Sequence, residues 1–253
     1  MDYWVILDGM NPVTVVILGE EPVRLIAPIG TPLSLVKLID PRASRGTLRA
    51  AASKAVELSE KGGVEYSYTG FSARHEEAVL QFREAGYQEL ADTHEMELPL
   101  DAPYESPNGL RFERVERGDL NRFLQLMKIY MSGSPDGALR LILKNIREMP
   151  DNFLDMWYSL EHLFLVYDGE MAVGMFDLNV NEATIGNIGV APEHRNKGYG
   201  RRIMTYGLSY LRNSGCTSAR LRVHVDNEPA IHLYETLGFR ALDRLKHLIW
   251  WRQ

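Results

Sequence analysis

The first stretch of the sequence that can do chemistry is residues 187–202, in which Arg195, Gly198 and Gly200 stand directly before a predicted helix. The first turn of a helix has unpaired N–H groups and lies at the positive end of the helix dipole. Glycines allow the phosphate oxygens of a ligand to reach those groups without meeting a side chain. Positive charge is added by Lys197, Arg201 and Arg202. The stretch predicts a diphosphate cradle; the alternative is a helix start whose glycines serve packing against a sheet.

The second stretch is residues 225–239, where Asn227 lies at a strand-to-helix junction and Tyr234 lies within the short helix that follows. Asn227 can act simply as a helix N-cap. Tyr234 can be a core aromatic residue whose hydroxyl reaches water. The functional interpretation is that both side chains contact a ligand whose phosphates bind to the first stretch.

The elements that must position these residues alternate between strands and helices, which predicts an α/β (α+β) layered fold with a mixed sheet. In the second half of the sequence we expect strands over Glu161–Tyr167, Met171–Val180, Ala183–Ala191, Leu221–Val225 and Ala241–Trp251, and helices over Gly198–Asn213 and Pro229–Thr236. In the first half we expect strands over Val13–Leu18, Val23–Ala27, Leu33–Ile39 and Val64–Tyr68, and helices over Thr47–Lys61 and Glu76–Glu84. Two or three further helices are expected between Asp119 and Leu160.

The sequence also repeats itself without gaps at an offset of 152 residues. Gly46 corresponds to Gly198, and Gly86 corresponds to Gly238. Further matches are Arg49 with Arg201, Gly63 with Gly215, Glu76 with Glu228 and Ala78 with Ala230. We interpret the repeat as an ancient duplication. Three prolines between Leu98 and Gly109 are typical of a connector, so we expect domains at residues 1–100 and 110–253, joined by a linker at 101–109.

Composition restricts the function. The net charge of −6 argues against general binding to nucleic acid or acidic membranes, which requires a basic surface. The single cysteine excludes an intrachain disulfide. The scattered histidines lack the spacing of metal ligands, so no metal is expected. No apolar run approaches the ~18 residues that a membrane span needs, and the first ten residues do not resemble a signal peptide. We therefore expect a cytoplasmic protein that binds neither nucleic acid nor membrane.

The residues of both stretches, in this order and separation, resemble the GNAT superfamily of N-acetyltransferases from about Leu110 to the end of the chain. The resemblance implies that acetyl-CoA is the acyl donor, and together with the duplication it implies that the first half is a degenerate GNAT-like domain with a structural role. The residues that it implies for binding acetyl-CoA are Ile188, Gly189, Val190, Arg195, Asn196, Lys197, Gly198, Tyr199, Gly200, Arg201, Asn227 and Tyr234.

The same resemblance assigns roles. The strand that ends near Val190 diverges from the strand at Leu221–Val225 and opens a slot for pantetheine. Backbone groups of Ile188 and Val190 pair with the pantetheine amides, and the N–H of Val190 points at the thioester carbonyl as an oxyanion donor. Tyr234 lies near the sulfur and donates a proton or hydrogen bond to the departing thiolate.

Two residues are candidates for the general base. Many relatives have a glutamate at the position of Thr184. Glu182, two residues earlier and therefore on the same strand face, is the first candidate, and His224 is the second. A water chain is the alternative, as are structural roles for both residues. Cys216 is expected to be a small core residue.

The expected function is transfer of an acetyl group to a primary amine by direct attack, in a monomer with an internal pseudo-dimer or in a homodimer. The acceptor is a small molecule or peptide: an antibiotic, a polyamine, an amino acid, a thiol cofactor precursor or a protein N-terminus. The helices between Asp119 and Leu160 are expected to form the acceptor side of the cleft. The alternatives are a non-catalytic acyl-CoA-binding regulatory module and an interaction scaffold.

The first half of the sequence is expected to bind no CoA. At the offset of 152, Ala43 replaces Arg195, Leu48 replaces Gly200, His75 replaces Asn227 and Phe82 replaces Tyr234.

Overall fold

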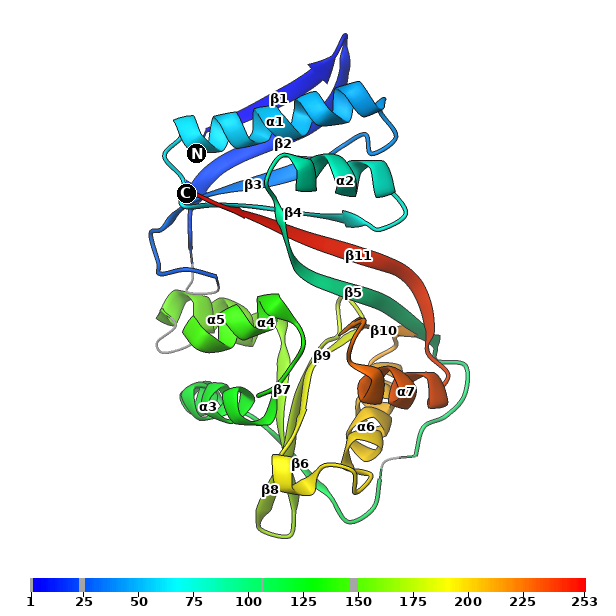
Figure 1. The fold of residues 1–253 in the computed structure, drawn as a ribbon. Coiled ribbons are helices and arrows are strands. Elements are labelled where there is room, and N and C mark those ends of the chain that lie inside the picture. Colours follow the sequence, from blue (N-terminus) through cyan, green and yellow to red (C-terminus); the bar gives the residue numbers. More distant parts are fainter. Residues whose placement is uncertain (1, 23–25, 106, 146–149) are drawn as a thin grey trace. The chain divides into compact units, whose positions relative to one another are not determined.

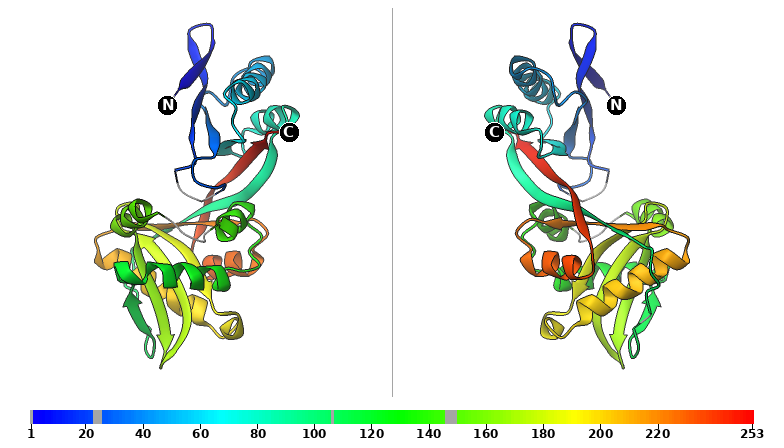
Figure 2. Two further views of the ribbon diagram at one scale, coloured as in Figure 1. Left: turned by 90° about the vertical axis from the view of Figure 1, so that its left-hand side faces the viewer. Right: turned by 90° about the vertical axis from the view of Figure 1, so that its right-hand side faces the viewer.

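The computed structural model describes residues 2–22, 26–105, 107–145 and 150–253, and these form two compact units of mixed α/β structure (Figures 1 and 2). Unit 1 comprises Met1–His94, Asp136–Asn145 and Asp243–Gln253, and unit 2 comprises Glu95–Pro135 and Ile146–Leu242. The expected mixed-sheet fold class is confirmed. Among the described residues, no helix is both long and apolar enough to cross a membrane.

Unit 1 contains β1 (Tyr3–Asp8), β2 (Asn11–Glu20), β3 (Pro32–Leu38), α1 (Arg45–Lys61), β4 (Tyr66–Ser72), α2 (Glu76–Glu84), α4 (Gly137–Asn145), the first part of β5 (Gln88–Pro99) and most of β11 (Arg240–Trp251). Its strand order is β1-β2-β3-β4-β11-β5. Strands β3 and β4 are parallel, and β11 is antiparallel to β4. The core consists of alanines of α1 packed against apolar side chains of β2 and β3 and against Leu248 and Trp250 of β11.

Unit 2 contains β6 (Arg111–Arg114), α3 (Leu120–Tyr130), α5 (Asp151–Leu160), β7 (His162–Asp168), β8 (Met171–Asn179), β9 (Thr184–Val190), α6 (Tyr199–Asn213), β10 (Ser218–His224), α7 (Glu228–Thr236) and the second part of β5. Short 3₁₀ turns lie at Arg117–Asp119 and Pro192–His194. Its strand order is β5-β10-β9-β8-β7-β6. Helix α6 packs on one sheet face through Ile203 and Gly207, while Tyr130 of α3 lies against Gly189 on the other.

The repeat at an offset of 152 recurs in the element boundaries. Strand β3 corresponds residue for residue to β9, β4 to β10, α2 to α7 and β5 to β11, and helices α1 and α6 end at corresponding residues. The positive φ of Gly86 (101°) is matched by that of Gly238 (99°). The same local backbone is therefore encoded twice.

The compact units differ from the contiguous domains expected from the sequence. Residues 243–253 pair with β4 and belong to unit 1, although they were expected to belong to the 110–253 domain. The expected connector begins later than Leu98, because β5 continues to Pro99. Strands β3 and β11 lie where strands were expected, whereas β1 and β5 were not expected. The predicted strand Val23–Ala27 lies partly outside the described residues, and residues 26–27 form a bend.

Strand β5 was missed because it is rich in charged residues. Its carboxylates pair with basic side chains of neighbouring strands. Asp92 accepts from Arg244 Nε at 2.8 Å and also from Lys246, while Glu97 accepts from Arg220 Nε at 2.9 Å. Although burial alone would raise it, these hydrogen bonds lower the pKa of Asp92 to about 2. Cross-strand ion pairs thus compensate for the weak apolar pattern of this strand.

Candidate active site

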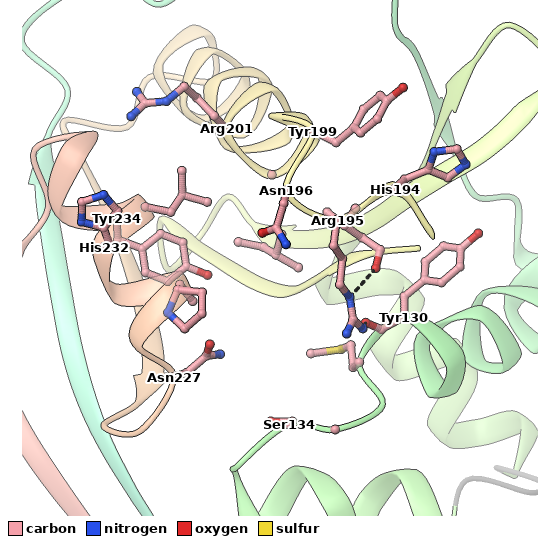
Figure 3. Close-up of a pocket in the computed structure, with 18 of the residues that line it drawn as sticks. Tyr130, Ser134, His194, Arg195, Asn196, Tyr199, Arg201, Asn227, His232 and Tyr234 are labelled. Carbon is pink, nitrogen blue, oxygen red and sulfur yellow. Dashed lines mark hydrogen bonds between the residues drawn. The ribbon is translucent and has the colours of Figure 1, made fainter. Parts of the chain in front are cut away.

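A cavity of about 670 Å³ lies within unit 2 between the end of β9, the start of α6, helix α7 and the segment after α3 (Figure 3). Ten residues of the expected CoA-binding set line it: Ile188, Val190, Arg195, Asn196, Gly198, Tyr199, Gly200, Arg201, Asn227 and Tyr234. The structure therefore brings together both sequence stretches. Of the other two, Gly189 is buried against α3, and Lys197 is exposed without lining the cavity.

The start of α6 is shaped for an anion. Gly198 occupies the N-cap position with φ +83°, a left-handed conformation that favours glycine, and no side chain caps the helix. Asn196 also has a positive φ of 60°. With Asn196 and Gly198 both in the left-handed backbone region, the loop turns sharply just before the first residue of α6. The first-turn N–H groups of α6 are therefore left to water or to a ligand on the cavity side.

Two of the nearby arginines are engaged with the protein itself. The Arg195 guanidinium donates to two backbone carbonyls, that of Tyr130 at 2.9 Å and that of Val190 at 3.3 Å. Arg201 Nη2 donates to the hydroxyl of Thr236 at 2.5 Å. Arg195 thus ties the loop to the end of α3 and to the end of β9, so that the backbone, rather than a free guanidinium, shapes the cradle.

Strand β9 carries a bulge beside the cavity. Its register with β8 shifts between the pairs Met175–Gly189 and Asp177–Gly186, so β9 has one residue more than β8 there. Beyond the bulge, the N–H of Ala191 donates to Val173 of β8 at 3.0 Å. Because N–H directions alternate along a strand, the N–H of Val190 points to the opposite edge of β9, as the oxyanion interpretation requires.

That edge of β9 is open. Strands β9 and β10 share a single register pair, Thr184 with Arg220. The corresponding strands of unit 1, β3 and β4, share four register pairs from Leu33–Tyr66 to Val36–Thr69. The expected divergence of the two strands after Thr184 is therefore present in unit 2, and unit 1 keeps the equivalent strands joined.

Helix α7 presents Asn227 and Tyr234 to the cavity. Asn227 stands at the N-cap position, but its side chain makes no capping hydrogen bond, so it is available to a ligand. Tyr234 is 8% exposed, and its hydroxyl points into the cavity (Figure 3). Burial raises the pKa of Tyr234 to about 12. Its phenol therefore keeps its proton near neutral pH and can donate it.

The two expected base candidates lie elsewhere. Glu182 is an exposed residue of the turn before β9, where its N–H donates to Asn179 Oδ1 at 3.1 Å. His224 Nδ1 accepts from the N–H of Asp226 at 3.2 Å. Neither residue lines the cavity. The geometry thus gives neither side chain direct access to a ligand in the cavity.

Two further features belong to the site, and the second of them, Asp177, was not predicted. The segment Met131–Pro135, part of the region Asp119–Leu160 that was expected to form the acceptor side, forms the wall of the cavity opposite Asn227. Asp177 of β8 is 3% exposed and accepts a hydrogen bond of 2.6 Å from Asn187 Nδ2. Burial raises the pKa of Asp177 to about 7, and the nearby Glu161 adds to the increase.

In unit 1 the equivalent helix start is filled by the protein's own groups. Ser44 caps α1 by accepting from the N–H of Thr47 at 3.2 Å, and Thr47 Oγ1 donates to Asp8 Oδ2 at 2.8 Å. A carboxylate of the chain thus lies near the positive end of α1, where an anion would bind. The capped start of α1 and the pairing of β3 with β4 therefore close, in unit 1, the slot and the helix end that are open in unit 2.

Comparison with known proteins agrees with this geometry. Residues 125–239 match the model of the acetyltransferase (GNAT) family. The chain is 28% identical to a mycothiol acetyltransferase from Nocardiopsis dassonvillei over 204 residues, which are 67% of this chain and 60% of that protein. It is 33% identical to one from Thermobispora bispora over 153 residues, 56% of this chain and 50% of that protein. The chain therefore spans about half to three fifths of the length of these relatives.

Solved structures share the fold. A GCN5-related N-acetyltransferase from Sphaerobacter thermophilus superposes with a TM-score of 0.64 at 15% identity, over 94% of this chain and 76% of that one. A tandem GNAT protein from the clavulanic acid biosynthesis pathway superposes with a TM-score of 0.60 at 18% identity, over 98% of this chain and 82% of that one.

Proposed function

We propose that this chain, which belongs to the GNAT family of acetyltransferases through its residues 125–239, transfers an acetyl group from acetyl-CoA to a primary amine. The single observation that carries the proposal is the open edge of β9, which runs from the uncapped start of α6 to the phenol of Tyr234. A thioester with a diphosphate at its far end fits such a path.

The fit to the donor rests on three parts of the cavity. The first-turn N–H groups of α6 and the loop around Gly198 would bind the diphosphate. The outward N–H of Val190 would donate a hydrogen bond to a carbonyl oxygen of the pantetheine arm or of the thioester. The amide of Asn227 would contact the arm from the opposite wall. No side chain caps the start of α6, and the side chain of Asn227 makes no capping hydrogen bond, so these donors are available to the acyl donor.

The chain's own groups then account for the transfer. The nitrogen of the neutral amine forms a bond to the thioester carbonyl carbon, and the carbon–sulfur bond breaks with its electron pair on sulfur. The N–H of Val190 stabilises the charge on the carbonyl oxygen. Tyr234 gives its proton to the departing thiolate, the proton lost by the amine passes to solvent, and the phenolate of Tyr234 takes a proton back from solvent. No protein nucleophile is required.

The acceptor would enter beside the segment Met131–Pro135, which faces Asn227 across the cavity. Because the chain resembles mycothiol acetyltransferases, the acceptor of those enzymes is the first amine to test. Amino acids, polyamines, amine antibiotics and peptide N-termini complete the panel.

The test combines calorimetry with an assay of CoA release. We expect CoA to bind, and we expect acetyl-CoA to release free thiol with at least one amine of the panel. If CoA binds but no amine of the panel is acetylated, the result would favour a regulatory acyl-CoA-binding module. Absence of heat at millimolar CoA, with no rise in melting temperature, would reject the proposal.

A further inference from the structure

We propose that Asp177 is a positioning residue for the acyl donor: through Asn187 it braces the β9 bulge that turns backbone N–H groups into the slot. The inference rests on the proposed function. It assigns a role to a carboxylate on β8, one strand away from the slot, which carries none of the motif residues.

The bulge depends on an unusual backbone conformation. Asn187 has φ +42°, in the left-handed region that residues with a Cβ seldom adopt. Asparagine and aspartate tolerate this region best among such residues, because their short side chains can form local hydrogen bonds. A side-chain partner for Asn187 is therefore what keeps the extra residue of β9 in place.

Asp177 supplies that partner. Its Oδ2 accepts from Asn187 Nδ2 at 2.6 Å; Asp177 is buried and Asn187 is half-buried. The neighbouring Gly186 leaves room for the carboxylate, because a Cβ at that position would lie 2.5 Å from Asp177 Oδ1. A glycine, an asparagine and an aspartate thus form one packed unit across β8 and β9.

The brace matters because of the residues that follow it. Ile188 and Val190 both line the cavity, directly after Asn187 in β9. If the bulge relaxed, the register between β8 and β9 would shift by one residue, and such a shift turns each side chain and each N–H to the other side. The N–H of Val190 would then face β8, and the slot would lose its donor.

The experiment exchanges the two partners. Asn187→Asp places a second carboxylate opposite Asp177, whereas the double variant Asp177→Asn with Asn187→Asp restores one donor and one acceptor. Asp177→Asn alone keeps an amide oxygen that can accept from Asn187. Asn181→Asp adds the same charge in the exposed turn before β9 and is the control. Each variant is titrated with CoA and with 3′-phosphoadenosine 5′-diphosphate, which lacks the pantetheine arm, and assayed for acetyl transfer.

We expect Asn187→Asp to weaken CoA binding and lower turnover by about tenfold, the scale of a lost buried hydrogen bond. Binding of 3′-phosphoadenosine 5′-diphosphate should change by less than about twofold, since it does not reach the bulge. The double variant should recover to within about threefold of wild type, and Asp177→Asn should stay in the same range.

Three results would overturn the inference. One is an Asn187→Asp variant with wild-type affinity for CoA. Another is a folded double variant as impaired as Asn187→Asp. The last is an Asp177→Asn variant that binds CoA normally without turnover, which would mean that Asp177 moves protons. A wild-type protein that binds no CoA would instead reject the proposed function itself.

Discussion

The phenol of Tyr234 lies where burial, rather than a neighbouring charge, sets its proton affinity. Its pKa of about 12 keeps the proton in place at neutral pH, and its hydroxyl points into the cavity. We predict that Tyr234→Phe lowers turnover by roughly tenfold or more, because the departing thiolate loses its proton donor. The affinity for CoA should be almost unchanged, since the phenyl ring remains. Steady-state rates and calorimetry on the same preparation measure both quantities.

A matched control is Tyr210→Phe on α6, outside the cavity, which removes the hydrogen bond between the Tyr210 hydroxyl and Nδ1 of His162 on β7. Its turnover should equal that of the wild type. Equal rates for Tyr234→Phe and wild type would remove the phenol from the mechanism.

Two buried aspartates should respond to pH in opposite ways. The folded state raises the pKa of Asp177 from 3.8 to about 7, so it holds a proton that the unfolded chain has already released. The free energy of unfolding should therefore fall as pH rises from about 4 to about 7 and then level off. We predict that Asp177→Asn melts several degrees above wild type at pH 8 and that this difference shrinks towards pH 4.

Asp92 provides the opposite sign. Its folded-state pKa of about 2 lies below the ordinary value, so its stabilisation is present above about pH 4 and is lost as pH falls towards 2. Asp92→Asn should accordingly melt below wild type at pH 7. Thermal melts of the three proteins between pH 2 and 8 are the measurement. A difference from wild type that does not change with pH, for either variant, would contradict the corresponding assignment.

At the scale of elements, the start of α6 can be compared with that of α1. Gly198 has φ +83°, whereas the corresponding Gly46 lies inside α1 with ordinary helical geometry. An alanine at Gly198 meets a backbone cost of about 1–2 kcal/mol unless the loop rearranges. We predict that Gly198→Ala weakens CoA binding by about tenfold, because the first-turn N–H groups move away from the diphosphate.

Gly46→Ala is the counterpart. A Cβ there would lie no closer than 3.9 Å to Ser44 Oγ, and alanine favours a helix by about 1 kcal/mol over glycine. Calorimetry should show wild-type CoA affinity, and the melting temperature should not fall. If both alanine variants weakened CoA binding equally, the assignment of the cradle to α6 would fail.

How much of this could be predicted from the sequence depends on whether a feature is local. Helix α7 and the loop before α6 carry their signals in consecutive residues, and the structure brings Asn227, Gly198 and Tyr234 to one cavity; that they bind acetyl-CoA stays a prediction. Strand β5 was missed because its carboxylates are matched by basic residues distant in sequence, such as Arg244. Asp177 was missed because its partner is defined by a bulge, and a register shift leaves no periodic pattern.

At the scale of the molecule, each half of the sequence contributes its last strand to the other half's core. Met96 and Leu98 of β5 belong to the core of unit 2, while Leu248 and Trp250 of β11 belong to that of unit 1. The corresponding boundaries of β5 and β11 show that the exchange is symmetric in sequence. Neither half, cut at the expected linker, therefore retains a complete core.

A fragment of residues 110–253 should accordingly fail to bind CoA by calorimetry, because it lacks β5 and exposes apolar side chains such as Phe239 and Leu221, which lie in the same core cluster. Co-expression with a fragment of residues 1–100, which carries β5, should restore binding. A soluble 110–253 fragment with full CoA affinity would contradict the exchange as a requirement for the fold.

The duplication raises the question of how many donors one chain binds. In unit 2 the strands β9 and β10 separate after one register pair, and no side chain caps α6. In unit 1 the strands β3 and β4 stay joined over four pairs, and Ser44, Thr47 and Asp8 occupy the start of α1. An arriving diphosphate would meet a carboxylate there instead of free N–H groups. We therefore predict one CoA per chain.

Calorimetry gives the stoichiometry directly, and hydrogen exchange shows where protection arises. With CoA, amides at residues 188–201 and 227–236 should exchange more slowly, whereas those at residues 44–49 and 75–84 should keep their rates. Asp8→Asn tests the cause, because it removes the charge at α1 while β3 and β4 remain joined. That variant should still bind one CoA, since the closed strands exclude the pantetheine arm. A stoichiometry of two in the wild type, or protection at residues 44–49, would show that unit 1 retains a working donor site.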